Sequence, residues 1–133
     1  MTWTYKENQV TEIDEKYIGF VYLITNLISG KKYIGKKLTK FVKYKSVKGK
    51  RKKIKVDSDW KDYWSSSIEL KEDIEKLGTD FFTREILHFC LTKGTTSYLE
   101  AKEQFINEVL EHPTLWYNGQ IRCRIHRSHI KRE

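Results

Sequence analysis

The sequence has few of the residues that mark disulfide-stapled, secreted or membrane-spanning proteins. It contains one proline and two cysteines, Cys90 and Cys123, among 133 residues. The cysteines show no metal-ligand spacing, and no apolar run approaches the ~20 residues that a membrane span needs. The N-terminus lacks the basic-then-apolar pattern of a signal peptide. We therefore expect free thiols, no secretion, no membrane contact and a cytoplasmic protein, in the host cytoplasm if a phage encodes it.

Acidic residues are missing from a long N-terminal stretch. Between Lys16 and Val56 there is no Asp or Glu, whereas 14 of the 26 basic residues lie there. Residues 119–133 add five basic side chains against one acid, and the formal net charge is +8. A solvated surface normally mixes charges of both signs, so this segregation indicates a polyanionic partner, for which we expect nucleic acid. A solvated loop or tail is the alternative explanation of a basic run.

Length and patterning favour one α+β domain. A chain of 133 residues is large enough for one modest core, so we expect 1–133 to be a single domain. Two apolar, aromatic segments separated by a turn predict a β-hairpin. The expected fold is a small central three-stranded antiparallel sheet flanked by helices. Its predicted elements are strands at 17–25, 31–37 and 81–89, and helices from the serines at 65–67 to Gly78 and over 97–111.

Three further segments lie outside this core. Residues 1–16 are polar and predict an arm or a short helix, and residues 119–133 form a basic tail. At about 38–57, loose alternation around a central glycine predicts an inserted basic β-hairpin or loop. We expect the insertion and the tail to bind nucleic acid through Lys43, Lys45, Lys48, Lys50, Arg51, Lys52 and Lys53, and through Arg122, Arg124 and Arg127.

The predicted hairpin carries a candidate site. Strand alternation places Tyr33, Gly35 and Lys37 on one face of their strand and Lys36 on the other. Without a side chain at Gly35, a bare patch of backbone beside Tyr33 would let a phosphate approach. Tyr22, on the preceding strand, would aim a second phenol at the same spot. Ordinary strand aromatics are the alternative explanation of both tyrosines.

Two polar residues further along the chain complete the candidate set. Glu103 lies in the predicted helix at 97–111, where it shares an edge with Leu99 and Leu110, and this favours it over Glu100 as the buried carboxylate. A solvated helix face is the alternative for both glutamates. Asn118 precedes a glycine, so its alternative role is to hold a turn. The expected inward stripe of the helix is Leu99, Phe105, Ile106, Val109 and Leu110.

Four short motifs in order resemble those of the GIY-YIG nuclease superfamily. Tyr33-Ile34-Gly35 matches the second half of that name, and Phe20-Val21-Tyr22 keeps the tyrosine of the first half. The stretch from Leu99 to Ile106 is similar to the family helix, with Glu103 in the place of its glutamate. Trp116-Tyr117-Asn118 resembles the closing Tyr-Asn element. The likeness covers roughly residues 18 to 120. Within the superfamily, the chain resembles the small freestanding phage members.

The resemblance implies a metal-dependent DNA endonuclease. Tyr22 would be the general base, its pKa lowered by neighbouring positive charge, and Tyr33 would shape the site. Glu103 would hold Mg²⁺ or Mn²⁺, and Asn118 would support the site. Most members carry an arginine soon after the Y-I-G strand. That arginine, which holds the scissile phosphate in those members, is missing here, and we expect Lys37, with Lys36 as reserve, to take this role.

Three questions stay open at the level of the sequence. A catalytically inactive nucleic-acid-binding protein on the same fold is the alternative function, and a basic RNA-binding protein is a third. Double-stranded DNA is preferred over single-stranded DNA as the partner. Cutting both strands would need two active sites, so the chain is expected to be a monomer that nicks or a homodimer.

Overall fold

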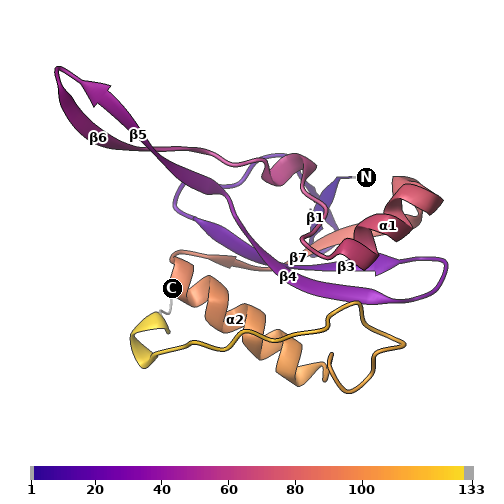
Figure 1. Cartoon of the computed structure of the whole chain (residues 1–133). Coiled ribbons are helices and arrows are strands. Elements are labelled where there is room, and N and C mark those ends of the chain that lie inside the picture. Colours follow the sequence, from indigo (N-terminus) through magenta and orange to yellow (C-terminus); the bar gives the residue numbers. More distant parts are fainter. Residues whose placement is uncertain (1, 131–133) are drawn as a thin grey trace.

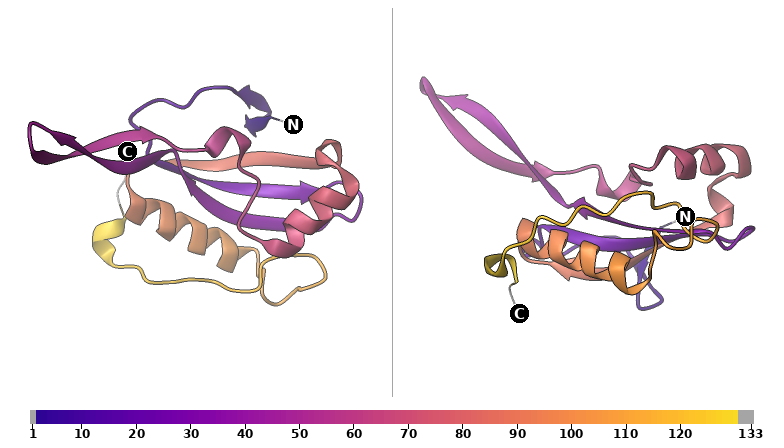
Figure 2. Two further views of the ribbon diagram at one scale, coloured as in Figure 1. Left: turned by 45° about the horizontal axis from the view of Figure 1, so that its top comes forward. Right: turned by 60° about the horizontal axis from the view of Figure 1, so that its bottom comes forward.

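The computed structural model describes residues 2–130, and it has an α+β fold (Figure 1). Five strands form one mixed sheet. A long helix, α2 (Lys93–Ile106), lies against one face, and a shorter helix, α1 (Ile68–Leu77), lies over the other (Figures 1 and 2). In this described part, no helix is long and apolar enough to cross a membrane.

The centre of the sheet is the antiparallel trio expected from the sequence. β3 (Gly19–Asn26) pairs antiparallel with β4 (Lys32–Leu38) on one side and with β7 (Phe82–Cys90) on the other. The prediction of a sheet with three strands is wrong in number, because two short strands extend the sheet. β1 (Trp3–Tyr5) pairs parallel with β7, and β2 (Asn8–Val10) pairs antiparallel with β1.

Part of the predicted N-terminal arm is therefore in the sheet, and Trp3 belongs to the core. Trp3 is 1 % exposed and packs edge-on against Phe20 and Tyr22. Its indole Nε1 donates a hydrogen bond to the carbonyl oxygen of Trp60 at 2.8 Å. Strands of three residues are too short to show a two-residue alternation, which explains why the sequence predicted an arm.

A buried arginine fixes the segment that precedes α1. The guanidinium of Arg84 lies 4.7 Å from the ring centroid of Trp3 and 4.3 Å from that of Trp64. It donates hydrogen bonds to the carbonyl oxygens of Lys61 and Tyr63 at 3.1 and 2.8 Å. Burial lowers the pKa of Arg84 to about 10, which leaves it charged at neutral pH. The segment, including the short 3₁₀ helix η1 (Trp60–Asp62), is thereby held over the sheet.

The long helix begins and ends earlier than the predicted range of 97–111. Thr92 caps it, accepting a hydrogen bond from the backbone N–H of Thr95 at 3.0 Å. The predicted inward stripe is wrong for Phe105, Ile106 and Leu110, which are 57 %, 64 % and 46 % exposed. The helix approaches the sheet through smaller or polar side chains instead, namely Thr96, Ala101 and Gln104.

The predicted basic insertion is a two-stranded ribbon, β5 (Lys40–Val47) and β6 (Lys50–Asp57). It projects from the body of the molecule and forms a sheet of its own (Figures 1 and 2). Its tip turns at Lys48 and Gly49, which have φ of 52° and 76°, as a two-residue hairpin turn requires. An ion pair between Lys40 and Asp57 closes its base.

The C-terminal segment runs back along α2 as far as the N-terminal end of that helix (Figure 2). It closes with a 3₁₀ turn, η3 (Arg127–His129), where the carbonyl oxygen of His129 accepts a hydrogen bond from Thr95 Oγ1 at 2.8 Å. Up to residue 130 the predicted tail therefore packs on the domain. The remaining part of that prediction, 131–133, lies outside the described residues. Between α1 and β7 the chain makes one more short turn, η2 (Thr79–Phe81).

Candidate active site

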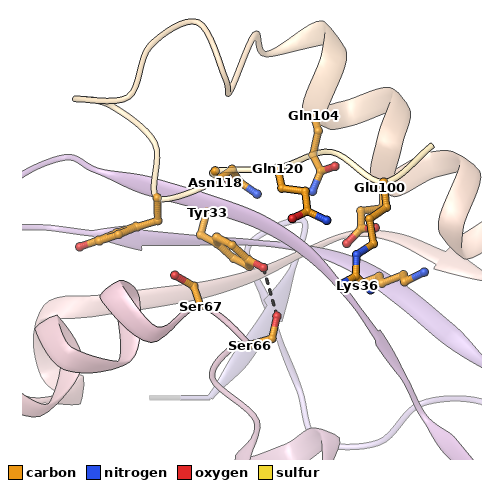
Figure 3. A pocket seen from close by; sticks show the side chains of 11 residues that line it. Tyr33, Lys36, Ser66, Ser67, Glu100, Gln104, Asn118 and Gln120 are labelled. Atoms are coloured by element: carbon orange, nitrogen blue, oxygen red, sulfur yellow. Dashed lines mark hydrogen bonds between the residues drawn. The ribbon is translucent and has the colours of Figure 1, made fainter.

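A pocket of about 590 Å³ opens at the edge strand β4, a volume in the range of ligand sites (Figure 3). Its walls come from four parts of the chain: β4, the serines before α1, helix α2 and the segment after Trp116. Because β4 is the edge of the sheet, side chains from both of its faces reach the same opening. The lining residues with ionisable or acceptor groups include Tyr33, Lys36, Ser66, Glu100, Gln104, Asn118, Gln120 and Arg122.

Tyr33 lies in this pocket, as the site prediction requires. Its hydroxyl hydrogen-bonds with Ser66 Oγ at 3.3 Å (Figure 3). Its ring centroid is 6.1 Å from that of Tyr22. Burial raises the pKa of Tyr33. The hydrogen bond from Ser66 opposes this shift, and the negative charge of Glu100 adds to it. Tyr33 is therefore a neutral phenol at neutral pH unless positive charge approaches it.

Tyr22 lies behind Tyr33 and does not line the pocket. It is 0 % exposed, and its hydroxyl has no hydrogen bond of normal geometry to the residues between 2 and 130. Burial raises its pKa well above the usual value, and the neighbouring phenols of Tyr33 and Tyr63 add to the shift. The direction is opposite to the lowered pKa that we expected for a general base.

Gly35 has a different role from the predicted one. It stands directly opposite Tyr22 in the β3–β4 register, so the Tyr22 phenol covers it. A Cβ atom at Gly35 would lie 2.5 Å from the Tyr22 hydroxyl oxygen and 2.8 Å from Tyr33 Cε2. The glycine therefore makes room for two phenols and leaves no bare backbone for a phosphate.

Glu100, rather than Glu103, is the carboxylate in the pocket (Figure 3). Burial raises the pKa of Glu100, while the positive charges of Lys36 and Arg122 oppose the shift. Glu103 forms a hydrogen bond with His88 at 2.9 Å between Oε1 and Nε2. The expectation that Glu103 faces the tyrosines is wrong, because the helix meets the sheet along Ala101 and Gln104 and so turns Glu100 toward β4.

The two candidate lysines point in different directions. Lys37 shares the face of Tyr33, but its Nζ pairs with Asp59 Oδ1 at 2.6 Å and lies 4.0 Å from the ring centroid of Tyr63. It does not line the pocket. Lys36 does, and its Nζ donates a hydrogen bond to Ser97 Oγ at 2.7 Å. The reserve candidate is thus the one beside Glu100.

Asn118 and Gln104 both bind the backbone of Ile34. Asn118 Oδ1 accepts from the Ile34 N–H at 3.0 Å, and its Nδ2 donates to the Ile34 carbonyl oxygen at 2.8 Å. Gln104 Nε2 donates to the same carbonyl oxygen at 3.0 Å. Gln104 Oε1 is buried and has no hydrogen-bond partner within residues 2–130. Sequence reasoning missed Gln104, although its place one helical turn after Glu100 was a usable signal.

The predicted nucleic-acid-binding residues fall into three groups. Arg122 lines the pocket. Arg124 and Arg127 are exposed on the segment that follows it. The ribbon residues are all exposed, and the Arg51 guanidinium lies 4.2 Å from the ring centroid of Tyr44. These ribbon residues are Lys43, Lys45, Lys48, Lys50, Arg51, Lys52 and Lys53.

A second group of possible metal ligands lies apart from the pocket. Glu108, Glu111 and His112 are exposed in the turns after α2, and their ligand atoms lie within 4.8 Å of one another. The proximity of Glu108 raises the pKa of Glu111. This cluster shares no residue with the pocket, so it contributes nothing to the chemistry there.

The comparisons with known proteins give one match. Residues 3–121, most of the chain, match the model of the family described as "Putative endonuclease segE, GIY-YIG domain". No curated protein and no solved structure matches the chain.

Proposed function

The chain belongs to the segE family of GIY-YIG endonuclease domains, and from this premise we propose that it hydrolyses DNA phosphodiester bonds with a divalent cation in the Tyr33–Glu100 pocket. Membership of an endonuclease family supports nuclease function. The observation that carries the finer proposal is the convergence of a phenol, one carboxylate and cationic side chains in a single pocket. Phosphodiester hydrolysis needs those groups: a base for the attacking water, charge compensation at phosphorus, and a proton for the leaving oxygen.

The oxygen atoms of the pocket suit Mg²⁺ or Mn²⁺. Both ions prefer hard oxygen ligands, and Mg²⁺ usually binds through one or two carboxylates plus water and phosphate. Glu100 offers a carboxylate, and the unpartnered Gln104 Oε1 offers a buried oxygen one helical turn away. A bound divalent cation would stabilise negative charge on the phosphoryl group and on the leaving oxygen. Glu100 thus takes the role that the sequence analysis gave to Glu103.

Tyr33 is our choice for the phenol that contacts the attacking water. It lines the pocket, whereas Tyr22 has no exposed surface. Since burial raises the pKa of Tyr33, the tyrosinate form requires positive charge nearby. Lys36 and a divalent cation held by Glu100 would supply that positive charge beside the phenol. Tyr22 acts behind it as a packing surface that fixes the orientation of the Tyr33 ring.

The ribbon β5–β6 is the proposed DNA-binding element. A two-stranded ribbon fits the major groove of B-DNA, which favours duplex DNA as the substrate. The exposed lysines of the ribbon would neutralise phosphates on both sides of the groove. One pocket hydrolyses one strand at a time. Cleavage of both strands therefore requires two copies of the chain or two successive nicks.

Relaxation of supercoiled plasmid tests the proposal. The wild-type protein with Mg²⁺ should convert supercoiled to open-circular DNA, and EDTA or Tyr33→Phe should abolish the conversion. If the wild-type protein and Tyr33→Phe both bind the plasmid and neither cleaves it, the chain is instead an inactive nucleic-acid-binding protein. That alternative rests on one observation, the raised pKa of Tyr33 in the pocket and of Tyr22 behind it. Faster cleavage or tighter binding of a matched RNA duplex would contradict DNA as the substrate.

A further inference from the structure

We propose that Arg122 binds the scissile phosphate, so that the C-terminal segment at 119–122 is part of the active site. From the sequence, Arg122 is expected only to bind nucleic acid as one of the basic residues of the tail. The inference rests on the proposed nuclease function and adds a catalytic residue to it. Three observations carry it: how the segment is anchored, what surrounds the guanidinium, and which other cations reach the pocket.

The segment that carries Arg122 is fixed on both sides. Just before it, Asn118 is hydrogen-bonded to the backbone of Ile34 on β4. Ile121 packs against the buried cluster between the sheet and α2. Beyond it, the ring of His129 packs so closely on Gly94 that a Cβ there would lie 2.8 Å from the ring. These anchors leave little freedom in the chain between them, so Arg122 is presented at a defined place.

Side-chain alternation along the segment turns Arg122 toward the pocket. Ile121, half-buried, faces the core on one side. Cys123 and Ile125 line a separate apolar groove on the outer face of α2, together with Tyr98 and Phe105. Arg122, between Ile121 and Cys123, lines the pocket that contains Glu100. A residue that served only as a distant DNA clamp would not need to reach into that pocket.

The guanidinium of Arg122 is available for a ligand. It makes no hydrogen bond or ion pair with any residue of the described chain, 2–130, although its charge acts on Glu100. Lys36, the other cation in the pocket, already donates to Ser97. Among the described residues that line the pocket, Arg122 is the single arginine. A guanidinium presents paired N–H donors to two phosphate oxygens, which an ammonium group does not.

The test uses full-length protein carrying Arg122→Gln, Arg122→Lys, Arg122→Ala and, as the matched control, Lys102→Gln. Lys102 is an exposed cation on α2 that lines the apolar groove and does not line the active-site pocket. Two readouts are measured for each: the plasmid nicking rate with Mg²⁺ at saturating protein, and the binding of thymidine 5′-phosphate, followed by backbone amide shifts of Tyr33 and Asn118.

The expected results separate a catalytic arginine from a merely structural one. Arg122→Gln should lower the saturating rate by about 10²-fold, the usual loss for one transition-state donor. Arg122→Lys should recover part of the rate, and Arg122→Ala should be rescued by added guanidinium. Lys102→Gln should keep the wild-type rate. The amide shifts on adding thymidine 5′-phosphate should disappear in Arg122→Gln.

Failure of the inference differs from failure of the proposed function. If the wild-type protein and Arg122→Gln cleave at the same saturating rate, the role of Arg122 is overturned and the nuclease proposal stays intact. Wild type that binds the mononucleotide through Arg122 but cleaves nothing would overturn the nuclease proposal and support the phosphate site. An absence of shifts at Tyr33 and Asn118 in wild type would overturn the phosphate site.

Discussion

The side chain of Asn118 pairs with both backbone polar groups of Ile34, accepting from its N–H at 3.0 Å and donating to its carbonyl oxygen at 2.8 Å. Ile34 sits in the edge strand β4, whose outer backbone groups would otherwise lack partners. The same side of β4 pairs with the chain just before Asn118, where Tyr117 N–H donates to the Lys32 carbonyl oxygen at 2.8 Å. Asn118 therefore provides partners for the outer backbone groups of Ile34 and begins the segment that leads to Arg122.

Asn118→Ala should destabilise the protein by about 2–3 kcal/mol, because it leaves two buried backbone groups of Ile34 with fewer partners. The free energy of unfolding in urea measures this loss. Asn8→Ala is the control, since Asn8 is exposed and its one hydrogen bond to the Lys6 carbonyl oxygen is 3.4 Å long. A loss at Asn118 no larger than that at Asn8 would show that the pairing contributes little.

Gly35→Ala should reduce both stability and nicking activity. The added methyl group would lie 2.5 Å from the Tyr22 hydroxyl oxygen, so the phenols must move apart. We expect a loss of about 1–3 kcal/mol, as for other overpacked cores. Gly119→Ala is the control for stability, because a Cβ there meets nothing within 4 Å. Equal melting temperatures for the two variants would contradict the close packing of the phenols.

The two tyrosines should respond differently to pH and to removal of the hydroxyl group. The pKa of Tyr22 is raised in the folded state, so its neutral form stabilises the fold below pH ~10 and this contribution is lost as pH rises further. Tyr22→Phe should therefore weaken the alkaline loss of stability, measured by urea unfolding between pH 8 and ~11.

Tyr22→Phe should also retain far more nicking activity than Tyr33→Phe. The reverse order of activities would return the base role to Tyr22.

The nicking rate itself should rise with pH. Burial raises the pKa of Tyr33, so the tyrosinate fraction increases about tenfold per pH unit below that pKa. A single-turnover rate measured with Mg²⁺ should follow this slope until the tyrosinate saturates or the fold is lost. A flat profile between pH 6 and ~9 would show that Tyr33 is not the titrating base.

Neutralising the ribbon should weaken DNA binding in a salt-dependent way. Each phosphate contact that is lost should reduce the slope of log K against log salt by ~0.9 for duplex DNA. Replacing Lys48, Lys50 and Lys52 by Ser should lower that slope and leave the melting temperature unchanged, since all three are exposed. The control replaces Lys71, Lys76 and Lys102, which lie on α1 and α2. An equal effect in both triple variants would mean that only total charge matters.

The predictable part of the fold had strong local signals. Asn26 and Gly30 mark the turn between β3 and β4, and the alternation of Tyr33 and Gly35 set their common face correctly. The ribbon was visible from Gly49 and the alternation around it. Strands β1 and β2 were not predictable, because three residues show no period and Trp3 is buried only by tertiary contacts.

The site was harder to predict than the fold. Glu100 and Glu103 differ by about 60° around the helix axis. Choosing between them therefore requires the rotation of the helix about its own axis, which the sequence does not give. The choice of Glu103 rested on the edge that it shares with Leu99 and Leu110, and apolar residues on a helix normally mark its buried face. Leu110 is 46 % exposed, so this signal was misleading. Arg122 belongs to the basic segment that the sequence placed outside the core, and its position in the pocket depends on tertiary packing that no local pattern shows.

The central claim is that Glu100, and not Glu103, is the carboxylate on which hydrolysis depends. The direct test compares plasmid nicking with Mg²⁺ by Glu100→Gln and Glu103→Gln, two equal losses of charge on the same helix. The claim predicts that Glu100→Gln loses activity by at least about 10²-fold, whereas Glu103→Gln stays within about threefold of wild type. Loss of nicking in Glu103→Gln, with Glu100→Gln still active, would contradict it.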